Sequence, residues 1–248
     1  MSLKQKVEEG WKISAEGYSE FIKDELNNGE KEIWTNLILE NAPKEGKLKI
    51  LDVGTGPGFF SIILSLAGHD VIGIDASEDM IKCAKENAEK AGVSPMFRVM
   101  DSHCVTFPDE SFDLIVSRNV VWTLVSPQSA YRDWLRLLKK GGRVLVFDAD
   151  WLGDCRDVSL KAQREKDRLE YTKNYGEPRV SYKDAEKARG WRVNLPLASE
   201  IRPDWDLKTM EKVGYGSIKC TIVSDRVYDK PRLLLNRSVP MFMVQGDK

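Results

Sequence analysis

Between residues 47 and 148, short apolar runs alternate with stretches of helical periodicity. Five runs predict strands, at 48–53, 70–75, 96–101, 112–117 and 143–148. Three stretches predict helices, at 59–67, at 77–91 and from Ser126-Pro127 to the pair Gly141-Gly142. Strands that alternate with helices and are apolar on both faces are typical of parallel sheets covered by helices. The sequence therefore predicts an α/β fold with a doubly wound, mostly parallel sheet.

The flanks of this region predict a cap, an insertion and an antiparallel ending. Residues 1–46 show two helical periodicities, which predict an N-terminal helical cap on the core at 47–150. Residues 151–205 are densely charged and carry scattered aromatic residues such as Tyr182, which predicts a helical insertion or lid. Residues 206–248 predict a helix followed by two strands. These strands are expected to form an antiparallel pair that completes a seven-stranded sheet, the last strand running antiparallel.

Composition disfavours several classes of partner for the 248-residue chain. Lys and Arg total 38 against 39 for Asp and Glu, so the charge that a nucleic-acid backbone would require is absent. No window approaches the roughly 18 consecutive apolar residues that a membrane helix needs, and the N-terminus does not resemble a secretory signal. The four cysteines form no CxxC pair, which suits a reducing compartment and predicts no metal site. We therefore expect a cytoplasmic protein.

The motif LDVGTGPGFF, at 51–60, lies where the first predicted strand turns into a helix. Its glycines allow a ligand to approach the backbone, and the helix N-terminus offers free N–H groups. The dinucleotide fingerprint GxGxxG requires a glycine where Phe59 stands, and no GK[ST] of a P-loop follows. The carboxylate of Asp52 at the strand end instead favours a cofactor that carries an amino or sulfonium cation.

Five segments in order resemble the class I S-adenosylmethionine-dependent methyltransferases, in the small-molecule branch called type 11 or ubiquinone-biosynthesis-like. DVGTGPG resembles the first motif of that family, and the strand and helix of 70–92 resemble the second. The run VMDSHCVTFPDESFDLIVSRNV resembles the third and fourth motifs, and LRLLKKGGRVLVFD the fifth. The resemblance implies a Rossmann-like methyltransferase fold and S-adenosylmethionine as cofactor, with S-adenosylhomocysteine as its product.

The resemblance also implies a set of cofactor-binding residues. They are Tyr18, Asp52, Gly54, Thr55, Gly56, Gly58, Asp75, Ala76, Met80, Asp101, Ser102 and Asn119. Asp75 is expected on the ribose hydroxyls, Asp101 and Ser102 on the adenine edge, and Ala76 and Met80 on the adenine faces. The alternatives are that Asp75 only begins a helix and that Asp101 only forms a turn.

The residues of the acceptor side are less defined by sequence. Asn119 is expected near the methionine end of the cofactor, and Tyr18 is expected to cover that end or the acceptor. Trp122, Asp148 and Asp150 are candidate substrate-binding residues, because they follow the fourth and fifth strands at the edge where ligands bind. His103 is a candidate proton acceptor, with a structural role on the adenine side as the alternative. Methyl transfer depends chiefly on positioning, so no catalytic residue is assigned.

The sequence thus predicts an enzyme that transfers a methyl group from S-adenosylmethionine to a small molecule under a lid formed by 1–42 and 151–205. Protein or RNA methylation is an alternative, favoured by a local excess of Lys and Arg over Asp and Glu in 156–192. A non-catalytic S-adenosylmethionine sensor on the same fold is another. A nicotinamide-dependent oxidoreductase is disfavoured by Phe59 and Asp52.

Overall fold

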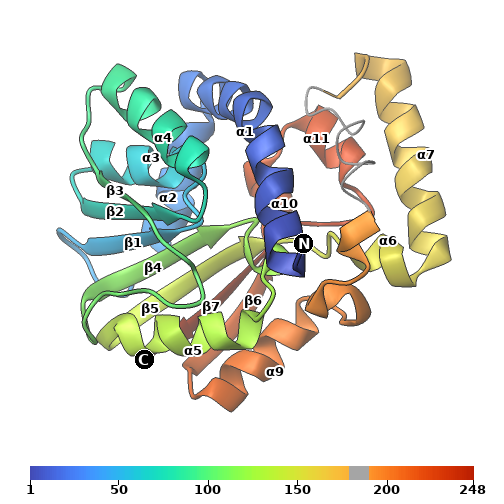
Figure 1. Cartoon of the computed structure of the whole chain (residues 1–248). Coiled ribbons are helices and arrows are strands. Elements are labelled where there is room, and N and C mark those ends of the chain that lie inside the picture. Colours follow the sequence, from blue (N-terminus) through green and yellow to red (C-terminus); the bar gives the residue numbers. More distant parts are fainter. Residues whose placement is uncertain (179–189) are drawn as a thin grey trace.

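Seven strands form one sheet in the computed structural model, which describes residues 1–178 and 190–248 (Figure 1). The strands are β1 (Lys49–Val53), β2 (Asp70–Asp75), β3 (Met96–Val99), β4 (Phe112–Arg118), β5 (Leu138–Asp148), β6 (Gly216–Ile222) and β7 (Phe242–Asp247). They lie in the order β3-β2-β1-β4-β5-β7-β6. β1 to β5 pair in parallel, whereas β7 is antiparallel to both β5 and β6. The predicted fold class is confirmed.

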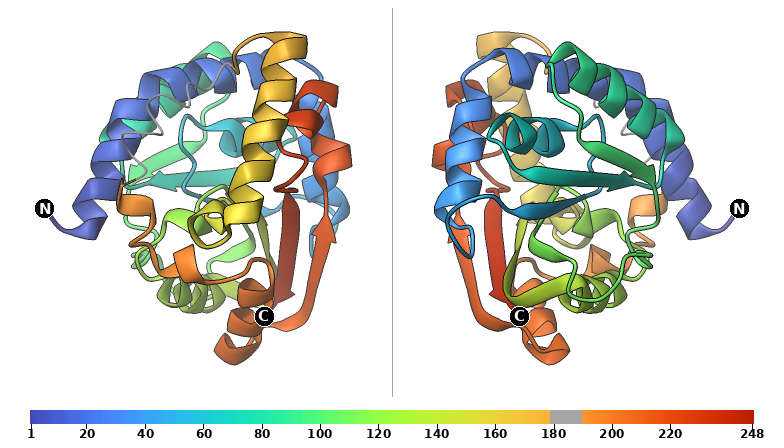
Figure 2. Two further views of the ribbon diagram at one scale, coloured as in Figure 1. Left: turned by 90° about the vertical axis from the view of Figure 1, so that its right-hand side faces the viewer. Right: turned by 90° about the vertical axis from the view of Figure 1, so that its left-hand side faces the viewer.

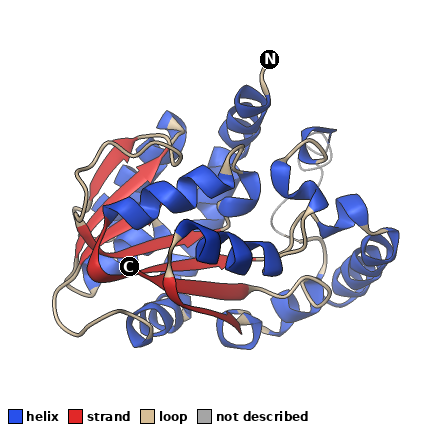
Figure 3. Ribbon diagram, turned by 90° about the horizontal axis from the view of Figure 1, so that it is seen from below, coloured by secondary structure: helices blue, strands red, loops and turns tan. Residues whose placement is uncertain are grey.

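Helices cover both faces of this sheet (Figure 3). The helices of the N-terminal part and the core are α1 (Leu3–Asn27), α2 (Glu30–Glu40), α3 (Phe59–Leu66), α4 (Glu78–Lys90), the 3-10 turn η1 (Val121–Thr123) and α5 (Pro127–Leu137). Those of the C-terminal part are α6 (Gly153–Arg156), α7 (Val158–Tyr175), the 3-10 turn η2 (Pro196–Ser199), α9 (Asp204–Val213), α10 (Ser224–Val227) and α11 (Lys230–Leu235). No helix in the described part of the chain is long and apolar enough to span a membrane.

The core is divided in two by the sheet, because neighbouring side chains on a strand point to opposite faces. On β1, Leu51 packs with residues of α5 and α9, whereas Ile50 packs with residues of α2, α3 and α10. Asp52 and Val53 then reach the carboxyl end of the strand, next to β4. The strand order reverses between β1 and β4, which is where open α/β sheets bind ligands.

The prediction that the helix after Ser126 runs to Gly141-Gly142 is wrong. α5 ends at Leu137 and the chain enters β5 at Leu138, so both glycines lie within the strand. The pairing of β4 with β5 is irregular there. A Cβ on Gly142 would lie 2.9 Å from the Lys139 carbonyl oxygen, so a larger residue would not fit the irregularity. The glycines therefore serve a strand bulge, not a helix end.

The segment 151–205 is helical in its described part, and its role as a lid stays a prediction. α7 lies beside α11, as Figures 1 and 2 show from three directions. The expectation for Tyr182 falls at 179–189, outside the described residues. α10 and α11, between β6 and β7, were not expected from the sequence.

Candidate functional site

The loop between β1 and α3 has a left-handed backbone at Gly54, Gly56 and Gly58, with φ of +67°, +52° and +94°. A Cβ on Gly54 would stand 2.3 Å from a Cγ of Val120, which follows the end of β4. Both the backbone angle and the lack of space therefore require glycine at this position. Gly58 caps the N-terminus of α3, and a Cβ there would stand 3.1 Å from the Cβ of Ala84 on α4.

Asp52 holds this loop from inside. Its Oδ2 accepts hydrogen bonds from Thr55 Oγ1 at 2.6 Å, Ser61 Oγ at 2.7 Å and the Ser61 backbone N–H at 3.0 Å. The side chain is almost completely buried, and this burial raises its pKa to about 6 despite the donors around it. The carboxyl group therefore links the loop to the first turn of α3.

Asp75, at the end of β2, accepts two backbone hydrogen bonds. Its Oδ2 accepts from Gly56 N and its Oδ1 from Ser77 N, each at 2.9 Å. Burial raises the pKa of this carboxyl group. The Ser77 hydroxyl in turn caps α4 by accepting from Met80 N. Asp75 therefore stabilises the start of α4, which was the alternative role predicted for it, and it also connects the glycine loop to β2.

Asp101 is held by residues on both sides. Its Oδ2 accepts from Lys4 Nζ on α1 at 2.7 Å, and its Oδ1 lies 2.6 Å from His103 Nδ1. Partial burial raises the pKa of Asp101, but the hydrogen bonds from Lys4 and His103 outweigh it and bring the pKa to about 2. His103 Nε2 accepts from Ser126 N at 3.1 Å, so both ring nitrogens are engaged. This geometry favours the structural role for His103 over that of proton acceptor.

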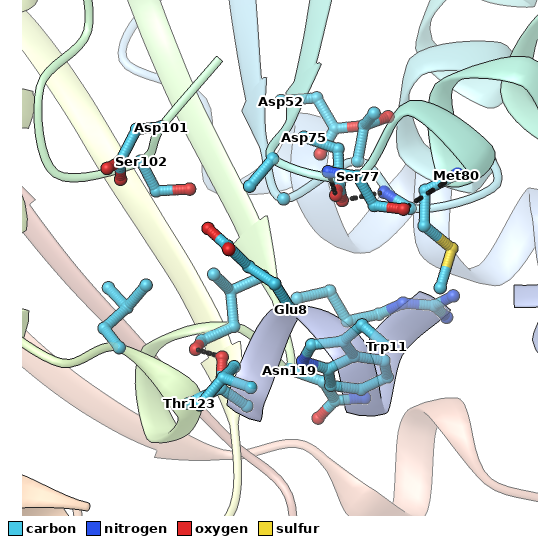
Figure 4. A pocket seen from close by; sticks show the side chains of 18 of the residues that line it. Glu8, Trp11, Asp52, Asp75, Ser77, Met80, Asp101, Ser102, Asn119 and Thr123 are labelled. Atoms are coloured by element: carbon cyan, nitrogen blue, oxygen red, sulfur yellow. Dashed lines mark hydrogen bonds between the residues drawn. The ribbon is translucent and has the colours of Figure 1, made fainter. Parts of the chain in front are cut away.

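These residues surround a cavity of about 130 Å³ (Figure 4). Eleven of the twelve residues predicted at the cofactor site line it, namely Tyr18, Asp52, Gly54, Thr55, Gly56, Asp75, Ala76, Met80, Asp101, Ser102 and Asn119. Gly58 does not line it, because α4 and Phe97 of β3 cover that glycine. Figure 4 shows Asp75 and Asp101 on two sides of the space and Trp11 of α1 facing them.

Sequence reasoning missed the contribution of the first turns of α1. Lys4, Val7, Glu8 and Trp11 line the cavity. Val7 and Trp11 repeat at helical spacing, which predicted a helix of the cap and lid but named no residue at the cavity before Tyr18. Nothing in that periodicity distinguishes a face that packs on the core from one that covers a cavity.

The three residues predicted to bind the substrate lie outside the lining of the first cavity. Asp148 is fully buried and accepts from Arg202 at 2.6 Å and from Trp122 N at 3.2 Å. Burial raises its pKa, although the Arg202 guanidinium opposes this. Asp150 forms an ion pair with Arg156. The ring Nε1 of Trp122 donates to the Asn119 carbonyl at 3.0 Å. None of the three is among the residues that line the first cavity, so their role in substrate binding stays a prediction.

A second cavity, of about 550 Å³, adjoins the first. It lies among α1, the start of α2, α7 and α11, and shares a wall of Tyr18, Arg118 and Asn119 with the first cavity. We call these three residues the shared wall. Among the residues that the structure describes, seven aromatic ones line the second cavity, namely Tyr18, Phe21, Trp34, Trp151, Tyr171, Tyr175 and Tyr228.

Arg118 is the central charge of the shared wall. Its guanidinium donates to Glu25 of α1 twice, at 2.8 and 3.2 Å, and lies 4.5 Å from the centre of the Phe59 ring. Burial lowers the pKa of Arg118, but the charge of Glu25 and its hydrogen bonds oppose this, and the pKa is raised overall. Glu25 also accepts from Arg232 at 3.3 Å, and Arg232 pairs with Glu30 at 2.6 Å. The network therefore joins β4, α1, α2 and α11 around the cavity.

Comparison with known proteins relates the central part of the chain to a family. Residues 51–146 match the family described as a methyltransferase domain of type 11. This part of the chain is similar to the S-adenosylmethionine-dependent methyltransferases. The resemblance seen in the sequence motifs is thereby confirmed, and S-adenosylmethionine is the cofactor of this family.

The similarity extends over part of the curated relatives. The chain is 28% identical over 174 residues to the uncharacterized methyltransferase YcgJ of Bacillus subtilis, covering 65% of this chain and 66% of that protein. It is 31% identical over 161 residues to a malonyl-[acyl-carrier protein] O-methyltransferase of Erwinia pyrifoliae, covering 65% of this chain and 57% of that protein. It thus spans somewhat less than two thirds of these relatives.

A solved structure shows that the fold extends beyond the matched domain. It is a candidate S-adenosyl-L-methionine-dependent methyltransferase of Methanococcus maripaludis, 21% identical to this chain. The two structures superpose with a TM-score of 0.61 over 96% of this chain and 93% of the other. The flanking helices and the two last strands therefore belong to a shared architecture.

Proposed function

We propose that the protein transfers a methyl group from S-adenosylmethionine in the first cavity to a small molecule in the second. The observation that supports this most directly is the shared wall. Tyr18, Arg118 and Asn119 line both spaces, so a cofactor in one and an acceptor in the other would meet there. Positioning two reactants side by side supplies much of the rate of such a displacement.

The residues of the first cavity fit this cofactor by their chemistry. The Asp75 carboxylate, at the carboxyl end of β2, is suited to ribose hydroxyls, and the apolar Met80 is suited to a flat base. The loop backbone after Gly54, together with the Asp52 carboxyl group, is suited to the amino-acid end. When bound, the cofactor supplies an electrophilic methyl group on a sulfonium.

The chain's own residues would then hold and enclose the reactants. Asp75 would orient the ribose, and Asp101 with Ser102 would face the adenine edge. The side chains of α1, including Trp11, which faces Asp75 and Asp101 in Figure 4, would exclude water from the reaction. Tyr18 and Asn119 would border the path from methyl group to acceptor.

Calorimetric titration with S-adenosylhomocysteine tests the cofactor half of the proposal. Asp75→Ala should weaken binding by about 1–3 kcal/mol, because charge-assisted hydrogen bonds to the ribose are lost. Asp70→Ala is the matched control, since Asp70 lies at the opposite end of the same strand and is exposed. Equal affinity in the two variants would remove Asp75 from the cofactor site.

Transfer of labelled methyl from S-adenosylmethionine into a size-fractionated cell lysate tests the acceptor half. Label in the low-mass fraction is the expected result. Label in protein or RNA would overturn the small-molecule acceptor while keeping the cofactor. No label in any fraction, with S-adenosylhomocysteine still bound, would favour a sensor.

A further inference from the structure

We infer that Trp151 is a positioning residue for methyl transfer, because its indole N–H holds the amide of Asn119 in the wall between the two cavities. This inference rests on the proposed function, since it names a residue that sets the geometry where cofactor and acceptor would meet. It is carried by the backbone of Asn119, by the two indoles that hold this residue, and by the contacts that hold Trp151 itself.

Asn119 has an unusual backbone conformation for a residue with a side chain. It directly follows β4 and has a left-handed φ of +58°. This conformation is strained for residues with a Cβ, although asparagine tolerates it better than most, and glycine would adopt it without strain. The amide is therefore what asparagine adds at this position. Residues held in such conformations cluster at functional sites.

Two indole groups hold Asn119 in place. Trp151 Nε1 donates to the side-chain Oδ1 at 3.0 Å, and Trp122 Nε1 donates to the backbone carbonyl oxygen at 3.0 Å. The backbone N–H of Asn119 donates to the Phe147 carbonyl oxygen at 2.9 Å, which connects it to β5. The backbone and the side chain of Asn119 are thus held by separate contacts, and Trp151 acts on the side chain.

The hydrogen bond from Trp151 determines how the amide is oriented. An indole N–H can only donate, so it pairs with the amide oxygen and leaves the NH2 group as the other end. Burial raises the pKa of the Tyr18 hydroxyl, and the charge of Arg118 and a hydrogen bond with the Asn119 amide oppose this rise. A neutral group opposes it by donating, so the NH2 end faces Tyr18. Without the Trp151 N–H, the amide is free to rotate.

Trp151 reaches the shared wall from the side of the second cavity. Its side chain lines that cavity, and Asn119 lines both cavities. Its backbone carbonyl oxygen accepts from Arg164 of α7 at 3.2 Å and also from Arg192. The segment that follows β5 therefore holds Trp151, and Trp151 holds the amide at the point where the two reactants would meet.

A packing role would make a different prediction for Trp151. A buried tryptophan usually finds some acceptor for its N–H, and its ring stabilises the fold whatever that acceptor is. A residue that only packs would therefore act independently of the Asn119 side chain. A residue that positions the amide loses its effect once the amide is removed. Combining two substitutions measures this difference.

The experiment is a double-mutant cycle of Trp151→Phe and Asn119→Gly. Phenylalanine keeps a ring in the second cavity but lacks the N–H, and glycine accepts a φ of +58° but lacks the amide. The readout is the rate of labelled methyl transfer from saturating S-adenosylmethionine into the low-mass fraction of a cell lysate. We expect each single variant to lose about tenfold in rate, and the double variant to lose no more than Asn119→Gly alone.

Losses that multiply in the double variant, or an unchanged rate in Trp151→Phe, would overturn the inference. Dilution of the low-mass fraction separates the rate at saturation from the amount of fraction that gives half of it. The rate at saturation should fall, because a misplaced wall group disturbs the reacting geometry more than it disturbs binding. A change confined to the half-saturating amount would mean that Trp151 only binds the acceptor, and would overturn the inference as well.

Trp205→Phe is the matched control. It also removes an indole N–H, but Trp205 lies on α9 and is not among the described residues that line either cavity. Its transfer rate should equal that of the unchanged protein, and a loss as large as that of Trp151→Phe would overturn the inference. Should Trp151→Phe fail to fold, the benzothiophene analogue of tryptophan at this position serves instead, because it replaces only the N–H by sulfur.

Calorimetric titration with S-adenosylhomocysteine separates this inference from the proposed function. Trp151→Phe should retain its affinity, because the Trp151 side chain lines the second cavity. A loss of affinity as large as the loss of rate would overturn the inference. Failure of the unchanged protein to bind S-adenosylhomocysteine, or to label the low-mass fraction, would instead contradict the proposed function.

Discussion

Replacing Arg202 by Met should be among the most destabilising single changes in this protein. Arg202 is 1% exposed at its side chain and donates to Asp148 at 2.6 Å and to Asp206 twice at 2.8 Å. Both carboxylates are fully buried. Removing the cation leaves two buried carboxylates without their counter-charge, although each keeps a hydrogen bond from elsewhere, and this costs about 3–5 kcal/mol. For a chain of this size, that loss lowers the melting temperature by about 6–20 °C.

The pH dependence of that loss distinguishes charge from packing. Burial already raises the pKa of Asp148 above its unfolded value, and loss of Arg202 would raise it further. The folded variant then binds more protons than the unfolded chain, so its free energy of unfolding falls as the pH rises through the folded pKa. The deficit relative to the unchanged protein should therefore be smallest near pH 5 and larger at pH 8.

Urea denaturation at both pH values measures this, with Arg226→Met as the control. Arg226 pairs with Glu40 on the surface, where such pairs contribute about 0–1 kcal/mol. The reasoning fails if Arg202→Met costs no more than the control, or if its deficit grows as the pH falls.

Two further predictions concern the first cavity. Gly54→Ala should weaken S-adenosylhomocysteine binding about tenfold or more, because the added Cβ would displace Val120. The control is Gly68→Ala, which has φ of +90° but open space around it, and which should cost only about 1 kcal/mol of stability. Equal affinity for S-adenosylhomocysteine in the two variants would refute this prediction. Affinity for S-adenosylmethionine should fall as the pH drops below about 6, because protonation of Asp52 removes a negative charge from the cavity. Asp52→Asn should bind more weakly and lose this pH dependence, and an unchanged pH profile in calorimetric titrations would count against it.

The residues of the first cavity could be predicted from the sequence because they lie at or after the ends of strands. Asp52, Asp75 and Asp101 each come directly after or within an apolar run, and parallel strands bring such positions to one edge. Periodicity reports which residues are buried, but not what they are buried against. Asp148 follows a strand in the same way, yet its partner Arg202 lies 54 residues further along and turns it inward.

No comparable sequence pattern predicts the second cavity. Its wall is assembled from α1, α2, the end of β4, α7 and α11, and no local pattern records that Phe21, Tyr171 and Arg232 face one space. α10 and α11 were missed for a related reason, since helices of four and six residues are too short to establish a periodicity. The predicted helix end at Gly141-Gly142 was wrong because a glycine pair is compatible with a helix end and with a strand bulge equally well.

The shared position of α1 decides which variants can separate cofactor from acceptor binding. This helix lines the first cavity through Lys4 and Trp11 and the second through Glu25, with Tyr18 in both. It is tied to the sheet edge at both ends, by Lys4 to Asp101 and by Glu25 to Arg118. A substitution on α1 that moves the helix therefore changes both cavities together, and its effect on one ligand cannot be assigned to one site. Asp75 and Glu30 each line a single cavity from elements other than α1, so only variants of that kind can show that the two binding events are distinct.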